Sequence, residues 1–221
     1  GWRRAQRRTH ALRTVVQAGA DNTVEVHIAM STPRLREDLI TYKIYPNGRL
    51  YVYHSAVPKQ DMLRFGFQIT LPGSYEYVNW YGRGPHPSYR DRKTGAALGR
   101  YQSTVTALEH RYMRPQESSN RTDTYDLYLC DSHGEGFRVQ AYYETPFAFS
   151  AYHYTTMGLD KAAHIHEIPY DPSLTTLNID GAQCGVGGDL PGQGAVRAPY
   201  RVTAGEKCSY AFILEPMHKK K

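Results

Sequence analysis

The sequence of 221 residues lacks any long apolar run. No stretch approaches the roughly 18 consecutive apolar residues of a membrane-spanning helix, and the mean hydropathy is −0.61. Residues 1–8 contain neither an initiating Met nor the apolar segment of a signal peptide. We therefore expect a soluble fragment of a longer protein with no membrane partner, and the sequence leaves a cytoplasmic or a periplasmic location open.

Cysteine is also scarce. Cys130, Cys184 and Cys208 are far apart, show no CxxC spacing, and leave one residue over in any disulfide scheme. A chain of this length can bury a sizeable core without disulfides. We predict three reduced, buried cysteines.

The positive charge is concentrated at the two ends of the chain. The formal net charge is +6, yet four arginines lie in residues 1–8 and three lysines form residues 219–221. The interior is close to neutral, so no basic groove for nucleic acid is implied. We expect no nucleic-acid partner.

Helical patterns are nearly absent. Residues 155–164 resemble a helix, weakened by Gly158, and we expect the only helix longer than one turn there. Apolar and polar residues instead alternate with a period of two, as half-buried strands require. The alternating stretches are 23–28, 63–71, 124–129, 137–144 and 209–214. The sequence predicts a single all-β domain, residues 1–221, built from packed antiparallel sheets.

Turn signals divide these stretches. Asn47-Gly48 accepts the positive φ values of a tight hairpin, so residues 38–57 are predicted to form one. Two segments, 82–101 and 180–199, are long and irregular. Loops of this length usually carry function or meet a partner, and we expect both at an interdomain face.

Two short motifs are weak candidates for ligand binding. His164, His166 and Glu167 place two imidazoles and a carboxylate within four residues, which suits either metal ligation or, more simply, a hydrogen-bonded pair. Residues 185–189 (GVGGD) resemble a phosphate-binding loop, but Pro191 forbids the helix that must follow. We interpret this segment as a sharply bent loop in which backbone packs against backbone.

No pair of acidic residues stands out as catalytic. A glycosidase needs two carboxylates at a defined separation, whereas loop aspartates usually cap turns or bind arginine. The candidates are Asp91, Glu117, Asp123, Asp180 and Asp189, with Arg90, Arg92, Arg114 and Arg121 at hand for pairing. No Ser/His/Asp arrangement with a G-x-S-x-G elbow is present in the sequence.

Four ordered motifs carry a resemblance to a known family. They are residues 79–101 (NWYGRGPH, then Tyr89, DRKTG and GRY), 114–123 (RPQE and NRTD), 150–167 (S-x-Y and AHIHE) and 177–189 (LNIDG and GVGGD). In this order they resemble the C-terminal β-domain of glycoside hydrolase family 2 β-galactosidases.

The resemblance implies an all-β supersandwich of two large antiparallel sheets, akin to galactose mutarotase. It also implies a non-catalytic domain, with no catalytic residue, metal ligand or cofactor of its own. The catalytic glutamates and the magnesium of the parent enzyme would belong to a central barrel domain, on which this domain packs. The parent would be a homo-oligomer that hydrolyses terminal β-D-galactosides with retention.

The sequence departs from the family at a loop expected near the substrate, residues Asp189, Leu190, Pro191 and Gly192. The family commonly places there a Trp that reaches the sugar site, and Gly192 stands at the corresponding position. An aromatic face contributes much of the affinity for a sugar, so a different handling of the substrate is implied. Residues 84–92 (GPHPSYRDR) also differ from the family's GPHENYPDR.

Two other functions remain open. One is a free-standing carbohydrate-binding module. The other is a mutarotase-like epimerase, which would need a general acid and base in a cleft, and His164, His166 and Glu167 are the cluster available for that role. Kinship of fold to mutarotases is analogy alone.

Overall fold

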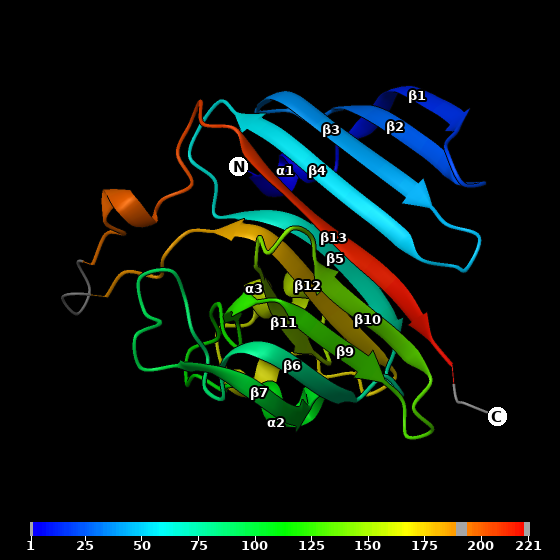
Figure 1. Cartoon of the computed structure of the whole chain (residues 1–221). Helices are drawn as coiled ribbons and strands as arrows, with labels where there is room; N and C mark the ends of the chain where they lie inside the picture. Colours follow the sequence, from blue (N-terminus) through cyan, green and yellow to red (C-terminus); the bar gives the residue numbers. More distant parts are fainter. Residues whose placement is uncertain (1, 189–193, 219–221) are drawn as a thin grey trace.

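The computed structural model describes residues 2–188 and 194–218 and contains two antiparallel sheets packed on each other (Figure 1). Among these residues the larger sheet has nine strands, in the order β1 (His10–Ala18), β2 (Val24–Ser31), β3 (Leu35–Ile44), β4 (Leu50–Pro58), β13 (Cys208–Met217), β10 (Gly136–Ala141), β9 (Asp126–Cys130), β6 (Tyr77–Gly84) and β7 (Ala97–Thr104). The smaller has four, in the order β5 (Arg64–Pro72), β12 (Leu174–Gln183), β11 (Phe147–Tyr152) and β8 (Arg121–Thr124). The predicted all-β class is confirmed.

The helices of the described ranges are short. They are α1 (Trp2–Gln6), α2 (Val105–Leu108), α3 (Thr156–Lys161) and the 3₁₀ helices η1 (Ile165–Glu167) and η2 (Ala198–Tyr200). Helix α3 lies within the predicted segment 155–164, and the Thr155 hydroxyl caps it by accepting a 3.0 Å hydrogen bond from the nitrogen of Gly158. Because α1 has five residues, the expectation of a single helix longer than one turn is wrong. In these ranges we find no helix with the length and apolar character needed to cross a bilayer.

The predicted hairpin is formed by β3 and β4, which pair from Leu35 with Pro58 to Ile44 with Leu50. Its turn is closed by hydrogen bonds from the nitrogen of Tyr45 to the oxygen of Arg49 (2.9 Å) and from the nitrogen of Gly48 to the oxygen of Tyr45 (3.0 Å). The positive φ falls on Gly48 alone (83°), because the connection is a bulged turn rather than a two-residue one.

The two irregular segments are shorter than expected. Residues 82–84 end β6 and residues 97–101 begin β7, with Gly82 paired to Gly99, so the first loop spans 85–96. Residues 180–183 complete β12, and the second loop therefore starts at Cys184. Pairing with neighbouring strands extends β6, β7 and β12 into segments that their residue composition alone predicts to be loops.

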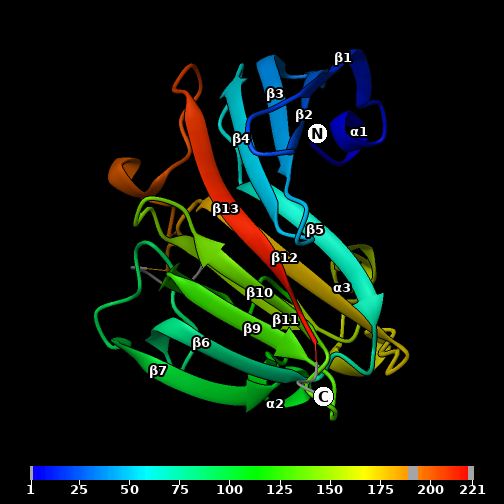
Figure 2. The same cartoon turned by 45° about the vertical axis from the view of Figure 1, so that its right-hand side comes forward.

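The core lies between the two sheets (Figure 2). Trp80 of β6 packs edge-on against Phe149 of β11, with ring centroids 5.7 Å apart. Phe67 of β5 packs in the same manner against Phe212 of β13, at 5.9 Å. Strand β13, the last in the sequence, lies at the centre of the larger sheet between β4 and β10.

The three cysteines form no disulfide, as predicted, but each is half-buried rather than fully buried. Burial raises the pKa of the thiols of Cys130, Cys184 and Cys208 above the ordinary value.

Candidate functional site

Three of the motifs that are separated in the sequence, those at 79–101, 114–123 and 177–189, meet around the 85–96 loop. Ser88 holds this loop against residues 120–122: its nitrogen donates to the oxygen of Asn120 (2.8 Å), and its hydroxyl accepts from the nitrogen of Thr122 (3.0 Å). The side-chain amide of Asn120 donates back to the oxygen of Ser88 (2.9 Å). All three residues are buried, so the loop is fixed by hydrogen bonds shielded from water.

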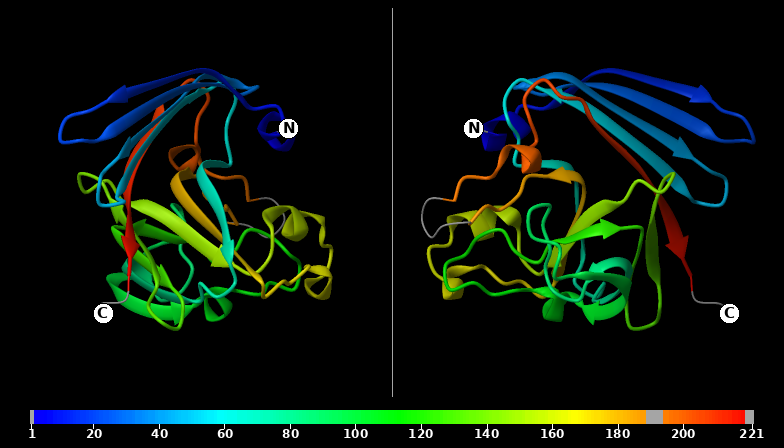
Figure 3. Two further views of the ribbon diagram at one scale, coloured as in Figure 1. Left: turned by 90° about the vertical axis from the view of Figure 1, so that its right-hand side faces the viewer. Right: turned by 60° about the vertical axis from the view of Figure 1, so that its left-hand side comes forward.

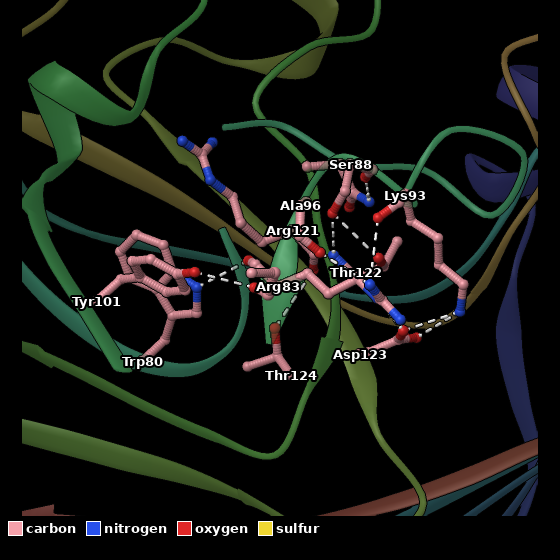
Figure 4. A network of polar contacts seen from close by, with 12 residues as sticks. Trp80, Arg83, Ser88, Lys93, Ala96, Tyr101, Arg121, Thr122, Asp123 and Thr124 are labelled. Atoms are coloured by element: carbon pink, nitrogen blue, oxygen red, sulfur yellow. Dashed lines mark hydrogen bonds and ion pairs between the residues drawn. The ribbon is translucent and has the colours of Figure 1, made fainter. Parts of the chain in front are cut away.

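Asp123 binds two cationic side chains close to the contact between Ser88 and residues 120–122 (Figure 4). Its carboxylate accepts from Nε of Arg83 (2.5 Å) and from Nζ of Lys93 (2.8 Å). Burial alone would raise the pKa of Asp123, but these two hydrogen bonds prevail and the pKa is lowered. Arg83 also donates to the carbonyl oxygens of Ala96 (2.8 Å) and Lys93 (3.2 Å), and so supports both ends of the loop's second half.

Arg121 donates its hydrogen bonds to backbone carbonyl oxygens and not to a carboxylate. Its buried guanidinium donates to the carbonyl oxygens of Leu108 (3.1 Å), Ser119 (2.6 Å) and Pro85 (3.0 Å). Burial lowers the pKa of Arg121 to about 10. The expectation that loop carboxylates pair with Arg90, Arg92, Arg114 or Arg121 is wrong for Asp123, which binds Arg83 and Lys93.

Asp91 fastens the second loop to the first. Tyr89 and Arg92 exchange two backbone hydrogen bonds (3.0 and 2.9 Å), which makes a tight turn that presents Asp91. The Asp91 carboxylate then accepts from the nitrogens of Val186 (3.1 Å) and Gly187 (2.8 Å). This contact joins the motifs at 84–92 and 185–189 directly.

The glycines of the second loop fit this contact. A Cβ on Gly185 would overlap the Asp91 carboxylate, and one on Gly187 would overlap the carbonyl of Gly194. Gly187 and Gly188 both have positive φ, 67° and 96°. The predicted bent loop with backbone packed on backbone is therefore present in the described part of this segment.

A buried ionic cluster lies on the outward face of the smaller sheet. Nε of Arg64 is 3.0 Å from the Asp180 carboxylate, and Nη2 is 3.4 Å from Glu117. Asp180 is 1% exposed, and burial raises its pKa to about 7 although Arg64 opposes the shift. Burial would lower the pKa of Arg64, but Asp180 and Glu117 outweigh it and the pKa is raised. The two carboxylates share one guanidinium.

The same face continues as a hydrogen-bonded polar layer. The amide nitrogen of Gln68 donates to Asn178 (2.9 Å) and Thr156 (2.6 Å), and the amide nitrogen of Asn178 donates to Ser150 (3.0 Å) and Tyr152 (2.9 Å). Sequence reasoning missed this layer and Arg64. The available signal was the alternation of Asn178 and Asp180 with apolar neighbours on β12.

The His164, His166 and Glu167 motif lies on η1 and the residues before it, not on a strand. The Glu167 carboxylate accepts from the nitrogens of Ala163 (2.8 Å) and His164 (3.2 Å), and these bonds lower its pKa. The two imidazole rings are parallel, with centroids 5.6 Å apart. Within residues 2–188 and 194–218, no three His, Cys, Asp or Glu side chains converge as metal ligands.

The residues predicted near the substrate, Asp189 to Gly192, lie outside the described residues. The adjoining residues border a small recess of about 140 Å³, lined by Asp91, Gly187, Ala195, Arg197 and Tyr200. The predicted role of residues 189–192 therefore remains a prediction.

Comparisons with known proteins agree with the motifs. A family model described as "Beta galactosidase small chain" matches residues 1–214. The β-galactosidase of Priestia megaterium is 30% identical over 220 residues, which cover 98% of this chain and 21% of that protein. The β-galactosidase of Halalkalibacterium halodurans is 33% identical over 181 residues, 78% of this chain and 18% of that protein. The chain thus spans about a fifth of the length of these relatives.

Among solved structures, galactose 1-epimerase from Lactobacillus acidophilus NCFM has a TM-score of 0.45 and 13% identity, covering 93% of this chain and 66% of that one. A galactose mutarotase-like protein from Lactobacillus casei has a TM-score of 0.44 and 12% identity, covering 92% and 73%.

Proposed function

Because the chain belongs to the beta-galactosidase small-chain family, we propose that it is a non-catalytic domain of an enzyme that hydrolyses terminal β-D-galactosides. The observation that carries this proposal is the extent of the match. Nearly the whole chain aligns with β-galactosidases, yet it accounts for about a fifth of their length. Catalytic carboxylates and magnesium would then belong to the barrel domain that lies outside this chain.

The carboxylates at this end of the sandwich support a structural role. Asp91 binds two backbone nitrogens, Asp123 binds Arg83 and Lys93, and Asp180 lies against Arg64. A retaining glycosidase needs one carboxylate free to attack and a second to donate a proton, about 5 Å apart. Asp91 and Asp123 serve as hydrogen-bond acceptors for their own fold, and Asp180 forms an ion pair with Arg64.

The loop held by Asp91 suggests how the domain takes part in the reaction. We infer that the 180–199 loop, with residues 189–192 nearest the substrate, is offered towards the mouth of the parent's active site. The turn at residues 89–92 and the glycines at 185 and 187 fix the start of this segment. A fixed base lets a loop meet a neighbouring domain without a large loss of conformational entropy.

The test compares the purified chain with the complete enzyme, each incubated with a chromogenic β-galactoside and magnesium. The complete enzyme is expected to turn over and the 221-residue chain is expected to be inactive. The chain is produced in a host that lacks its own β-galactosidase. Hydrolysis that follows the isolated chain through purification would refute the non-catalytic role. Tight, saturable galactose binding by the isolated chain would instead favour a carbohydrate-binding module.

A further inference from the structure

The larger sheet extends past the smaller one. The smaller sheet ends at β5, whose Phe65 and Phe67 pack against His54 of β4, with ring centroids 4.4 and 5.2 Å apart. Beyond β4 lie β3, β2 and β1, which we call the N-terminal wing (residues 10–44). The wing projects from the body of the sandwich (Figure 3).

One row of paired residues crosses all nine strands described for this sheet and is apolar throughout. From β1 to β7 it consists of Ala18, Val24, Ile44, Leu50, Leu214, Val139, Leu127, Trp80 and Tyr101. Val139 and Leu127 are 0% and 1% exposed, whereas Val24 and Ile44 are 41% and 44% exposed. The residues of this row are apolar in the body and in the wing alike. Their exposure differs because the smaller sheet covers the row in the body and ends before the wing.

The next row repeats this gradient. Val16 on β1 pairs with Val26, which pairs with Tyr42, and Tyr42 pairs with the core residue Val52. Val52 is 2% exposed and Val16 is 65% exposed. The face of the wing that is continuous with the sandwich core is therefore apolar over several strands and uncovered at its outer strand.

The opposite face of the wing carries polar and charged side chains that bind one another. Glu25 accepts a hydrogen bond from Gln17 (3.2 Å) and forms an ion pair with Lys43 (3.4 Å), and His27 is bonded to Thr41 (3.1 Å). Antiparallel strands with one solvated face carry polar residues on that face and apolar residues on the buried one. One face of the wing is thus suited to water and the other to an apolar partner. The 221-residue chain leaves the outer strand of the apolar face without such a partner.

We propose that a neighbouring domain of the same β-galactosidase polypeptide covers the apolar face of the wing with an apolar patch of its own. This inference rests on the proposed function, since it takes the rest of the enzyme to be present. The relatives contain about four times more chain outside this domain than within it. Interfaces between domains of one chain bury about 600–1,500 Å², which a face spanning three strands can supply.

Charge and backbone geometry argue against a second copy of this chain as the occupant. Arg4, Arg7 and Arg8 are exposed directly before β1, and a twofold contact at this end of the wing would bring two sets of them together. The pairing of β1 with β2 is also interrupted by a bulge between Ala11 and Arg13, a feature that discourages edge-to-edge pairing.

The test is thiol footprinting with a maleimide. Val16→Cys places a thiol on the apolar face of β1, and Gln17→Cys, the matched control, places one on the opposite face of the same strand. Val24→Cys repeats the measurement on β2. Each variant is labelled both in the 221-residue chain and in the complete enzyme, and the parent sequence corrects for Cys130, Cys184 and Cys208.

We expect the Val16→Cys and Val24→Cys thiols to react at least about tenfold more slowly in the complete enzyme than in the isolated chain, because a packed interface excludes the reagent. The Gln17→Cys thiol should react equally in both. Equal rates for Val16→Cys in an enzyme that hydrolyses galactosides would overturn the docking surface alone. Protection in an enzyme without that activity would support the surface and refute the proposed function. Protection confined to a dimer of the isolated chain would also overturn it.

Discussion

The carboxylate of Asp91 accepts a 2.8 Å hydrogen bond from the backbone nitrogen of Gly187, 96 positions later in the chain. A second bond reaches the neighbouring nitrogen of Val186. One side chain of the first loop thereby holds the backbone of the segment after β12, together with a bond from the nitrogen of Gly185 to the oxygen of Tyr200 (2.8 Å).

Replacing Asp91 should loosen the second loop while leaving the sheets intact. Asp91→Ala removes an ionised acceptor from two backbone nitrogens, each bond contributing about 1.5–3 kcal/mol. Amide hydrogen exchange at Val186 and Gly187 should therefore quicken by about tenfold or more. Asp91→Asn, which keeps one carbonyl oxygen, should show an intermediate effect. Unchanged exchange in Asp91→Ala would show that the loop is held by other contacts.

Gly185→Ala should destabilise the chain because its Cβ would overlap the Asp91 carboxylate. The expected loss is about 1–3 kcal/mol in the free energy of unfolding, measured by urea denaturation. The same substitution in the Asp91→Ala background should cost less, since the clashing group is gone. Additive losses in the double variant would contradict this explanation.

Asp180 should make the stability of the chain depend on pH. Its carboxyl has an ordinary pKa of 3.8 and a folded-state pKa of about 7, raised by burial, so the folded state retains a proton that the unfolded state has released. The stability advantage of wild type over Asp180→Asn should be greatest near pH 4, shrink as the pH rises to about 7, and then stay level. Within that window the unfolding constant should change by up to about tenfold per pH unit.

Urea denaturation of both proteins at pH 4–9 measures this difference. Glu117 and Arg64 face Asp180 and are present in both proteins, so their own titration largely cancels. An advantage that grows between pH 5 and 7 would show that the Arg64 ion pair dominates over burial.

Replacing Arg83 should cost more stability than replacing Asp123, the aspartate that it binds. Arg83→Ala removes the donor for Asp123 and for the carbonyls of Lys93 and Ala96, with an expected loss of about 2–3 kcal/mol. Asp123→Asn affects a partly exposed ion pair and should cost about 1 kcal/mol or less. Thermal denaturation of the two variants checks the order, and a reversed order would place the ion pair above the carbonyl contacts.

Gly192→Trp tests the proposed role of the loop near the substrate. If the loop faces the active site, an added indole supplies a stacking surface for a sugar. In the complete enzyme the KM for at least one galactoside should fall, by about fivefold or more for a gain of roughly 1 kcal/mol. Identical kinetics for every galactoside tried would contradict the role.

Much of the fold could be predicted because alternation reports burial directly. Residues 63–71 alternate strictly, and β5 occupies nearly the same range, Arg64–Pro72. The same logic fails for β12, where Asn178 and Asp180 alternate with apolar residues yet are themselves buried. Polarity in a sequence does not distinguish a side chain that meets water from one that meets a partner.

Those partners are distant in the sequence. Gln68 and Asn178 are bonded across 110 positions, and Asp91 reaches Gly187 across 96. The register of the sheets brings such residues together. The residue types next to each partner in the sequence do not predict these pairs. Arg121 and Arg114 are nearer to Asp123 in the sequence than Arg83 is, yet β6 lies beside β8 in the fold and brings Arg83 to the carboxylate.

The central position of β13 has a consequence for synthesis and folding. Within the described part of the chain, strands β1–β4 pair with the group β10, β9, β6 and β7 only through residues 208–217. On the ribosome the larger sheet therefore exists as two separate halves until those ten residues emerge. Joining them requires contacts of long sequence separation, which fold slowly. Until then, both the edge of β4 and the edge of β10 stay open, and a stalled or truncated chain offers two unpaired edges to its neighbours.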